Sequence, residues 1–260
     1  MIRVRDGRPT LPTVTLVAVT SIGLDATVRA LSASIRQVGF GRALLLSDRR
    51  PSAFEGTSIE WTEIPPIRSK AEYSRFMLHE LADHVQTSHV LCVQWDGFVL
   101  NGDLWDDEFL EYDYIGAIWP NFSDGHTVGN GGFSLRSRRL LQALKNLPYD
   151  GSTAEDLVIC RVLRPQLEQL GFRIAPEEVA RRFAYERTAP TGKEFGFHGA
   201  FNLVELINSR EAFTILKSLE AQVLNRNEHR ELLRWAIRKG YPKIASLLIC
   251  RILRQRVIGT

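Results

Sequence analysis

The chain is poor in cysteine and methionine, and it has no long apolar run. Its three cysteines, Cys92, Cys160 and Cys250, lie far apart in apolar surroundings. This arrangement counts against a disulfide framework or a zinc cluster and indicates buried thiols in a reducing compartment. No apolar run approaches the roughly 18 residues that a membrane-spanning helix needs. We therefore expect a soluble, cytoplasmic protein.

The composition is that of a globular protein, and the charge is distributed unevenly along the sequence. It has 260 residues, of which 44% are hydrophobic and 24% charged, which is enough for a substantial core. The formal net charge of +3 is concentrated near the end, because residues 201–260 hold 11 lysines and arginines against 5 acidic residues. We find no internal repeat and no low-complexity stretch. The final segment is therefore the basic part of the chain.

The hydrophobic pattern alternates between strand and helix. Val14–Thr20 reads as a buried strand, Asp25–Val38 has helical spacing, and Ala43–Ser47 is a second short strand. This is the β-α-β rhythm of a parallel sheet. The pattern predicts three further helices, at Ser69–His84, Ser137–Leu147 and Ala154–Leu170. It also predicts three further strands, at Val90–Val93, Tyr114–Ile118 and Gly132–Arg136.

The last part of the chain has a different pattern. From Leu203 to Ile258 the spacing is helical almost throughout, with one break at Gly240-Tyr241-Pro242. We predict an α/β fold in which an open, mostly parallel, Rossmann-like sheet is flanked by helices. The expected division is a nucleotide-sugar-binding catalytic domain over residues 1–202 and a basic helical extension over residues 203–260.

Two motifs follow or precede predicted strands. Asp96, in Gln94-Trp95-Asp96-Gly97, comes just past the apolar run Val90–Val93, where an open α/β sheet places its ligands. A carboxylate there suits Mg²⁺ or Mn²⁺, although for this residue taken alone a turn-capping aspartate is the favoured explanation. The stretch Gly129-Asn130-Gly131-Gly132 leads into a strand. It is therefore neither a Rossmann fingerprint nor a P-loop, and it is either a ligand-approach loop or a hairpin turn.

Two more motifs carry titratable groups. Glu155 and Asp156 begin a predicted helix, where carboxylates serve as helix-start residues or, near an acceptor hydroxyl, as a general base. His198 lies between glycines and aromatics in Phe195-Gly196-Phe197-His198-Gly199. A neutral imidazole can bind a metal or donate to a phosphate, and a packed structural histidine is the alternative.

Together the four motifs resemble the ordered signature of GT-A-type glycosyltransferases. That signature is an Asp-X-Asp metal motif, a glycine loop, an X-Glu-Asp motif and a late histidine. The sequence is also similar to an uncharacterised bacterial family of glycosyltransferase-like domains, over about residues 12–202. The segments that carry this resemblance are Val93–Phe98, Asp113–Trp119, Gly129–Arg136 and Phe195–Gly199.

The resemblance implies a mechanism. Asp96 and His198 would bind Mn²⁺ or Mg²⁺ with the diphosphate of a sugar donor, and Asp156 would take the proton of the acceptor hydroxyl. Glu155 would orient the acceptor or support the base. One departure is that Gln94 stands where the first acid of the metal motif is expected, which puts metal dependence in doubt.

The resemblance also implies contacts with the two substrates. Trp119 and Phe133 would offer flat surfaces to the acceptor sugar, although core packing explains either. The residues expected at the donor are Thr20, Ser21, Asp48, Lys70, Tyr73, Arg75, Gln94, Trp95, Gly131 and Gly132.

The predicted function is therefore a hexosyltransferase-like glycosyltransferase. It would move a sugar from a nucleotide-diphosphate sugar, with a UDP-sugar as the first choice, to a glycan or lipid-linked hydroxyl with inversion, in surface polysaccharide synthesis. The alternative is a non-catalytic carbohydrate- or nucleotide-binding protein with a degenerate site. A glycoside hydrolase is less favoured, because adjacent acids on a helix point in different directions.

The basic helical extension has its own expected partners. Nucleic-acid binding is not favoured, since basic helical faces usually face solvent or a partner. Peripheral contact with the inner face of the membrane and homo-oligomerisation are the two expectations. The cations concerned are Arg226, Arg230, Arg234, Arg238, Lys239, Lys243, Arg251, Arg254 and Arg256.

Overall fold

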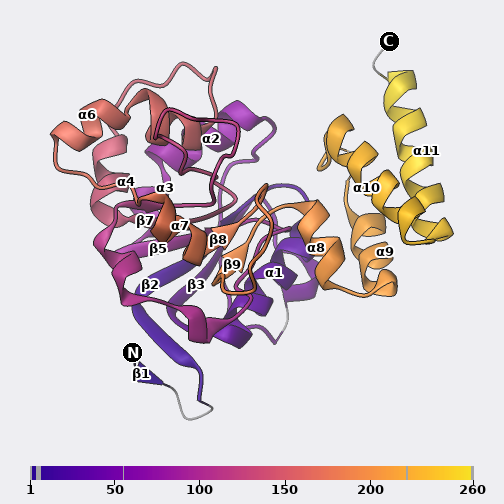
Figure 1. The fold of residues 1–260 in the computed structure, drawn as a ribbon, viewed down its shortest axis with the longest axis horizontal. Helices are drawn as coiled ribbons and strands as arrows, with labels where there is room; N and C mark the ends of the chain where they lie inside the picture. The colour runs from indigo at the N-terminus through magenta and orange to yellow at the C-terminus, as the bar shows by residue number, and fades with distance from the viewer. Residues whose placement is uncertain (1, 4–6, 55, 221, 259–260) are drawn as a thin grey trace.

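A seven-stranded sheet forms the centre of the molecule (Figure 1). The computed structural model describes residues 2–3, 7–54, 56–220 and 222–258. Along the sheet the strands follow the order β4 (Glu60–Glu63), β3 (Gly39–Ser47), β2 (Pro9–Val19), β5 (His89–Val93), β7 (Phe133–Ser137) and β6 (Tyr114–Ile115), and β1 (Ile2–Arg3) pairs with β2. Strands β4, β3, β2 and β5 are parallel, and β7 runs antiparallel to both β5 and β6. The predicted open, mostly parallel α/β sheet is confirmed.

The central strands are apolar on both faces because helices cover both sides. Along β2, Leu16 and Ala18 join the core cluster that includes Val28 and Leu31 of α1 (Leu24–Gln37). The alternate residues Val17 and Val19 join a second cluster on the opposite face, with side chains of α2 (Lys70–His79) and α3 (Leu81–His84). Successive strand side chains point to opposite faces, which explains why the sequence shows a continuous apolar run there.

The helices of the α/β part differ from the prediction mainly in their ends. The predicted helix Ser69–His84 is divided at Glu80 into α2 (Lys70–His79) and α3 (Leu81–His84). The predicted helix Ala154–Leu170 is three short pieces with a π-helical turn in the middle. The remaining bounds are α4 (Arg138–Leu144), α5 (Glu155–Leu157), η4 (Val158–Val162), α6 (Arg164–Gln169), α7 (Glu177–Phe183), η1 (Ser52–Phe54), η2 (Gly102–Leu104) and η3 (Asp107–Glu111).

Two very short strands carry the chain toward the candidate site. β8 (Ala184–Tyr185) pairs in parallel with β9 (Gly196–Phe197), and Gly196 also bridges to Val99. Strand β6 ends earlier than predicted, because Gly116 lies against the glycine stretch, where an added Cβ would be 1.6 Å from the Gly129 carbonyl oxygen. The backbone after β6 and the backbone of the glycine stretch Gly129–Gly132 therefore lie directly against each other.

Four helices form the predicted C-terminal helical appendage, at one side of the molecule (Figure 1). They are α8 (Ala200–Leu206), α9 (Ser209–Ser218), α10 (Arg226–Arg238) and α11 (Pro242–Ile258). Their buried side chains, such as Leu232 and Leu248, form one core cluster that also includes Ala26 and Phe197 of the α/β part. The appendage is therefore packed onto α1 and β9.

One buried carboxylate ties the outer edge of the sheet together. Asp113, just before β6, is 3% exposed. Its side chain accepts hydrogen bonds from the Ser137 hydroxyl, the Arg139 guanidinium and, at 2.8 Å, the Arg173 backbone N–H. Three segments thus converge on a single side chain.

We expect the substitution Asp113→Ala to lower the free energy of unfolding by about 3 kcal/mol, because it leaves three buried or half-buried donors without their acceptor. Urea denaturation followed by circular dichroism measures the change. The control is Asp83→Ala, which removes an exposed pair with Lys145 and is expected to cost less than about 1 kcal/mol. Equal costs for the two variants would show that the Asp113 cluster does not stabilise the fold.

Candidate functional site

The candidate site lies where the strand order reverses. Strand β2 has β3 on one side and β5 on the other, and ligands of open α/β sheets bind outside the carboxyl ends of such strands. β5 ends at Val93, and the Gln94 backbone N–H then donates to the Gly132 carbonyl at 2.9 Å. Because β7 is antiparallel to β5, the glycine stretch that precedes it reaches the same edge. Two of the predicted motifs are therefore adjacent.

The glycine stretch forms a loop whose backbone lies directly against the side chains of Asn130 and His198. Asn130 has a φ of 69°, and its side-chain oxygen accepts from the Gly132 N–H at 2.9 Å. The Tyr114 hydroxyl donates to the Asn130 carbonyl at 3.1 Å. A Cβ at Gly132 would stand 2.1 Å from Nε2 of His198. Glycine is therefore required at position 132 if the imidazole is to stay where it is.

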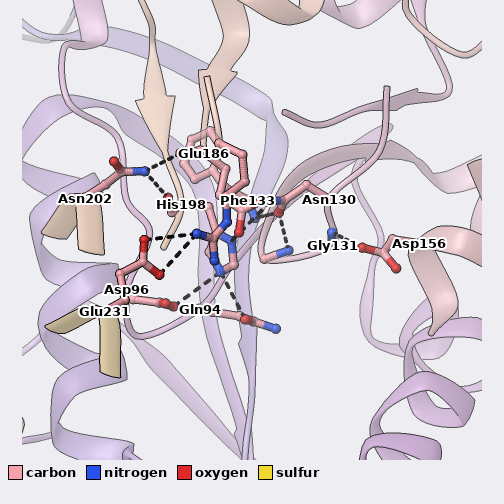
Figure 2. Close-up of polar contacts among 12 residues, drawn as sticks. Gln94, Asp96, Asn130, Gly131, Phe133, Asp156, Glu186, His198, Asn202 and Glu231 are labelled. Atoms are coloured by element: carbon pink, nitrogen blue, oxygen red, sulfur yellow. Dashed lines mark hydrogen bonds and ion pairs between the residues drawn. The ribbon is translucent and has the colours of Figure 1, made fainter. Parts of the chain in front are cut away.

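His198 is the centre of the site (Figure 2). Its Nε2 lies 3.3 Å from Asp96 Oδ1 and 3.2 Å from Gln94 Oε1. Its Nδ1 lies 3.3 Å from Glu186 Oε1, and the Asn130 amide donates to the other oxygen of Glu186 at 2.8 Å. The structure thus brings together Asp96 and His198, which are 102 positions apart in the sequence.

This environment raises the pKa of His198. Burial alone lowers it, but the charges and hydrogen bonds of Asp96 and Glu186 outweigh that effect and raise the pKa to about 10. Burial raises the pKa of Glu186, and its contacts with His198 more than reverse this, so the net shift is downward. At neutral pH the metal-free protein therefore holds an imidazolium between two carboxylates.

The donor set at this point fits a divalent cation only in part. Asp96 is buried, and its Oδ1 has no hydrogen bond of good geometry beside its ion pair with His198. Asp96, His198 and the amide oxygen of Gln94 could hold Mn²⁺ or Mg²⁺ if His198 gave up its proton. Within the described residues, no three histidine, cysteine or acidic side chains are grouped for a metal. The remaining ligands would have to come from a diphosphate and water.

Asp156 lies on the other side of the glycine loop from Asp96 and His198 (Figure 2). Its Oδ2 accepts from the Gly131 N–H at 2.9 Å, and its Oδ1 accepts from the Leu157 N–H at 2.8 Å. The side chain is partly exposed. The predicted base therefore borders the same loop as the predicted metal ligands, and it retains access to solvent.

Glu155 requires a correction. Its side chain is buried and forms an ion pair with the fully buried Arg136 at 3.0 Å, and Ser74 contacts its other oxygen. A Cβ at Gly131 would be 2.2 Å from Glu155 Oε1, so the glycine loop covers this pair. Glu155 therefore faces the core, where its contacts suit the predicted support of the base and leave no exposed side-chain surface to orient an acceptor.

The two residues predicted to stack on the acceptor sugar, Trp119 and Phe133, lie in different environments. Phe133 is fully buried among the aromatic rings of Phe183 and Phe195, so the acceptor surface predicted for it is wrong. Trp119 is partly buried and packs over Gly129, where an added Cβ would be 2.0 Å from the indole. Trp119 thus shields the start of the glycine loop while keeping part of its surface open.

The predicted donor residues lie on five segments, namely after β2, after β3, on α2, after β5 and before β7. The Thr20 hydroxyl is engaged with the backbone of Ile22, and the buried Ser21 hydroxyl accepts from the Ile67 N–H at 2.8 Å. Ser21 is therefore occupied in holding the loop before α2. Asp48, at the end of β3, forms an ion pair with Arg49 at 3.1 Å.

The other donor candidates are on or near α2. The Tyr73 hydroxyl accepts from the Gln94 amide at 3.1 Å, and burial raises its pKa, so it remains a neutral phenol. Lys70 and Arg75 are exposed on the same helix. Trp95 is partly buried against the core cluster of the C-terminal helices. Tyr73 and Gln94 are therefore joined to His198, whereas Arg75 makes no contact with this network among the residues that the structure describes.

Sequence reasoning missed two residues that hold His198 in place. Glu186 follows β8, and Asn202 is on α8. The Asn202 amide donates to the carbonyls of both Glu186 and His198, at 2.8 and 2.7 Å. No sequence signal marked Glu186, while Asn202 lies one helical turn after His198 and could have been included with that motif.

The C-terminal helices also reach the site. Glu220, after α9, accepts from the Gly23 N–H at 2.7 Å, at the start of α1. Burial raises the pKa of Glu228 on α10, and Asp96 adds to this effect, while Lys70 and His198 oppose it. The C-terminal helices therefore contact the start of α1, and Glu228 lies within electrostatic reach of Asp96.

A small cavity of about 200 Å³ lies beside this contact. It is formed by the start of α1, the loop after β3 and the end of α9. Arg49, Arg50 and Ser52 line one side, and Ser218 and Glu220 line the other. The cavity is next to Asp48, and it has both cationic and anionic walls.

Comparisons with known proteins give a family and two similar structures. A search of curated proteins finds no match to this chain. The chain is similar to an active-site mutant of LgtC, with 13% identity, a TM-score of 0.47, and coverage of 84% of this chain and 100% of that chain. It is also similar to the glycosyltransferase GlyE of Streptococcus pneumoniae TIGR4, with 13% identity, a TM-score of 0.44, and coverage of 71% and 53%.

A family model described as a protein of unknown function, DUF5672, matches residues 57–198. The matched segment runs from before β4 to the histidine at the centre of the site. Because it covers more than half of the chain, the protein belongs to the DUF5672 family.

Proposed function

We propose that this protein is a glycosyltransferase that uses a nucleotide-diphosphate sugar. The observation that carries the proposal is the convergence of Asp96, His198 and Asp156 around one glycine loop, outside the carboxyl ends of β2 and β5. Each motif is weak alone. A transferase with this ordered signature requires these motifs to meet at the edge of the sheet where ligands bind.

In this proposal the donor diphosphate lies over the glycine loop, near Asp96 and His198. A divalent cation, when bound, would offset the negative charge that develops on the diphosphate leaving group. Gln94 keeps an amide oxygen near His198 and anchors itself through Tyr73. Its role would be to orient the donor or a metal-bound water without adding charge.

Asp156 is proposed as the general base. It has a solvent-accessible side chain, and two backbone N–H groups fix the orientation of its carboxylate. A carboxylate so held can accept the proton of an acceptor hydroxyl as the oxygen attacks the anomeric carbon, which gives inversion. Trp119, at the start of the loop, is the remaining candidate for contact with the acceptor sugar.

The finer assignments are also proposals. We take a UDP-sugar as the donor to test first and a glycan or lipid-linked hydroxyl as the acceptor, in surface polysaccharide synthesis. The nucleoside would lie toward Thr20, Asp48 and the cavity beside Arg49. A thermal-shift screen of nucleotide diphosphates and nucleotide sugars, with Mn²⁺ present and absent, selects among donors.

A second candidate function is a carbohydrate- or nucleotide-binding protein without turnover. The observation that favours it is Gln94, which leaves Asp96 as the single carboxylate of the metal motif. Donor binding without hydrolysis or transfer, across a broad panel of donors and acceptors, would support this candidate and contradict the transferase.

The substitution Asp156→Asn should lower the transfer rate at least about a hundredfold, because the amide cannot accept the acceptor proton. The amide oxygen can still accept from one backbone N–H, so donor affinity and folding should change little. Radiolabelled sugar transfer and donor calorimetry measure the two properties. The matched control Asp150→Asn, in the exposed turn before α5, should retain the parental rate. A parental rate in Asp156→Asn would identify a different base.

The affinity for Mn²⁺ should rise about tenfold for each pH unit between pH 7 and 9. The reason is that the pKa of His198 is raised to about 10, so the metal must displace a proton over this whole range. Calorimetry in buffers of different ionisation enthalpy counts the released proton. Asp96→Asn should weaken binding at least about tenfold, whereas Asp83→Asn, whose exposed carboxylate pairs with Lys145, is the control. A pH-independent affinity would show that His198 is not a ligand.

The substitution Gly132→Ala should displace His198 and lower Mn²⁺ affinity along with transfer. Its Cβ would overlap the imidazole, which four neighbours hold in place, so we also expect destabilisation by about 1–3 kcal/mol. The control is Gly125→Ala, which has a positive φ but no neighbour within 4 Å of the added Cβ. If Gly132→Ala retained the parental affinity, the close approach of the loop to His198 would have no role in binding.

A further inference from the structure

The outward face of the last two helices differs from the rest of the surface. α10 and α11 pack against each other, with a short turn between them. Their inner sides bury Leu232, Trp235, Ile244 and Leu248 in the C-terminal core cluster. Figure 1 shows α11 at the edge of the molecule, farther from the sheet than α8 and α9. The opposite sides of both helices are therefore free to contact a partner.

Cations and aliphatic side chains are mixed on this outward face. On α10 they repeat at three- and four-residue intervals, which places them on one side of the helix. The aliphatic side chains are large and open, since Ile237, Ile249 and Leu253 are 63%, 44% and 53% exposed. We call this the basic face, and its exposed members are Arg226, Arg230, Arg234, Ile237, Lys243, Ile249, Cys250, Leu253 and Arg254.

The cations of the basic face are not neutralised by acids of the same helices. α10 and α11 contain two acidic residues, and both point away from this face. Glu228 closes the capping box at Asn225, and Glu231 pairs with Arg187 of the α/β part at 3.2 Å. The five basic-face cations have no ion pair among the described residues, and the side chain of Arg256 lies outside that set.

Three other cations of α10 and α11 and the turn between them have polar partners within the appendage. Arg238 and Lys239 approach Glu205 of α8, at 3.8 and 2.7 Å. Arg251 donates to the carbonyls of Lys217 and Leu219. These contacts hold the helices in place, and so these three side chains are excluded from the basic face.

We propose that the basic face docks on an anionic lipid surface. A membrane interface is the one environment that accepts both kinds of side chain together, since arginines meet lipid phosphates while aliphatic side chains enter the headgroup boundary. The inner sides of α10 and α11 are already used for packing. The contact would therefore be shallow, charge-dominated and sensitive to salt.

Two other occupants fit less well. A second copy of the same face would bring five unpaired cations against five others, and like charges across an interface are unfavourable. Nucleic acid would use the cations, but the face has no aromatic side chain for base stacking, because Trp235 is buried and packs with Tyr241. Nucleic acid would also leave the exposed Ile249 and Leu253 without an apolar partner. Within the described residues, no helix is long and apolar enough to cross a bilayer.

The test is sedimentation of the full chain with large unilamellar vesicles. One vesicle population is pure phosphatidylcholine, and the other contains about one third phosphatidylglycerol. We expect the protein to pellet only with the anionic vesicles, and to be released when the salt is raised well above physiological ionic strength. The triple variant Arg230→Gln, Arg234→Gln, Arg254→Gln should lose partitioning by about fivefold for each arginine removed.

Two further variants separate the contributions to docking. Leu253→Ser should weaken partitioning without changing the salt dependence, because the side chain is exposed and carries no charge. The matched control removes three exposed arginines of the α/β part, Arg36→Gln, Arg173→Gln and Arg181→Gln, and should pellet as the parent does.

Four outcomes would overturn the proposal. They are no pelleting with anionic vesicles, equal pelleting with neutral vesicles, equal loss in the control triple variant, and self-association in analytical ultracentrifugation that the basic-face substitutions abolish. Circular dichroism of each variant verifies that the helices remain folded. Transfer to a soluble acceptor should be unaffected, because no basic-face side chain has a contact with the residues around His198.

Discussion

The site depends on one close contact, the imidazole of His198 against the bare backbone of Gly132. An added Cβ at that glycine would stand 2.1 Å from Nε2, so no other residue leaves room for the ring. Asp96 and Gln94, both in the loop after β5, approach one ring nitrogen, and Glu186, after β8, approaches the other. Removing water from these groups is costly, and their mutual attraction offsets that cost only while the geometry is kept. The contact therefore fixes the relative positions of the loops after β5, before β7, after β8 and after β9.

A second buried pair gives Asp156 its position. Arg136 and Glu155 meet beneath the glycine loop, and the Glu155 backbone N–H donates to Ser74 of α2 at 3.2 Å. Such a pair is weak evidence for stability, because its desolvation cost is comparable to its attraction. What it does fix is the orientation of α5, whose next residue is Asp156. The acid of the motif that turned out to be buried thus positions the acid that remains open to solvent.

The sequence predicted those parts of the fold that are set locally. The apolar runs of β2, β3 and β5 placed the carboxyl ends of these strands to within one residue, whereas β2 and β3 begin five and four residues earlier than predicted. The order of the four motifs also led to Asp96 and His198 as neighbours. The burial of Glu155 could not be predicted, because it depends on an ion pair with Arg136, 19 positions away. No local sequence pattern indicates that Arg136 is itself buried. Glu186 was missed for the same reason, since its role exists only once β8 pairs with β9.

The C-terminal helices show how one element can serve two surfaces. Basic residues and helical spacing were evident from the sequence, but which side chains face inward is decided by packing against α1 and β9. Glu220 binds the start of α1 and Glu228 lies within reach of the charges at Asp96, so the acids of these helices are turned toward the site. The unpaired cations are left on the opposite side. Part of this division follows from docking, because Glu211 pairs with Arg29 and Glu231 with Arg187 of the α/β part. Glu205 pairs with Lys239 within the appendage, and a cation without an acid partner remains in solvent. The basic face is therefore what remains once the acids of these helices have been used for packing.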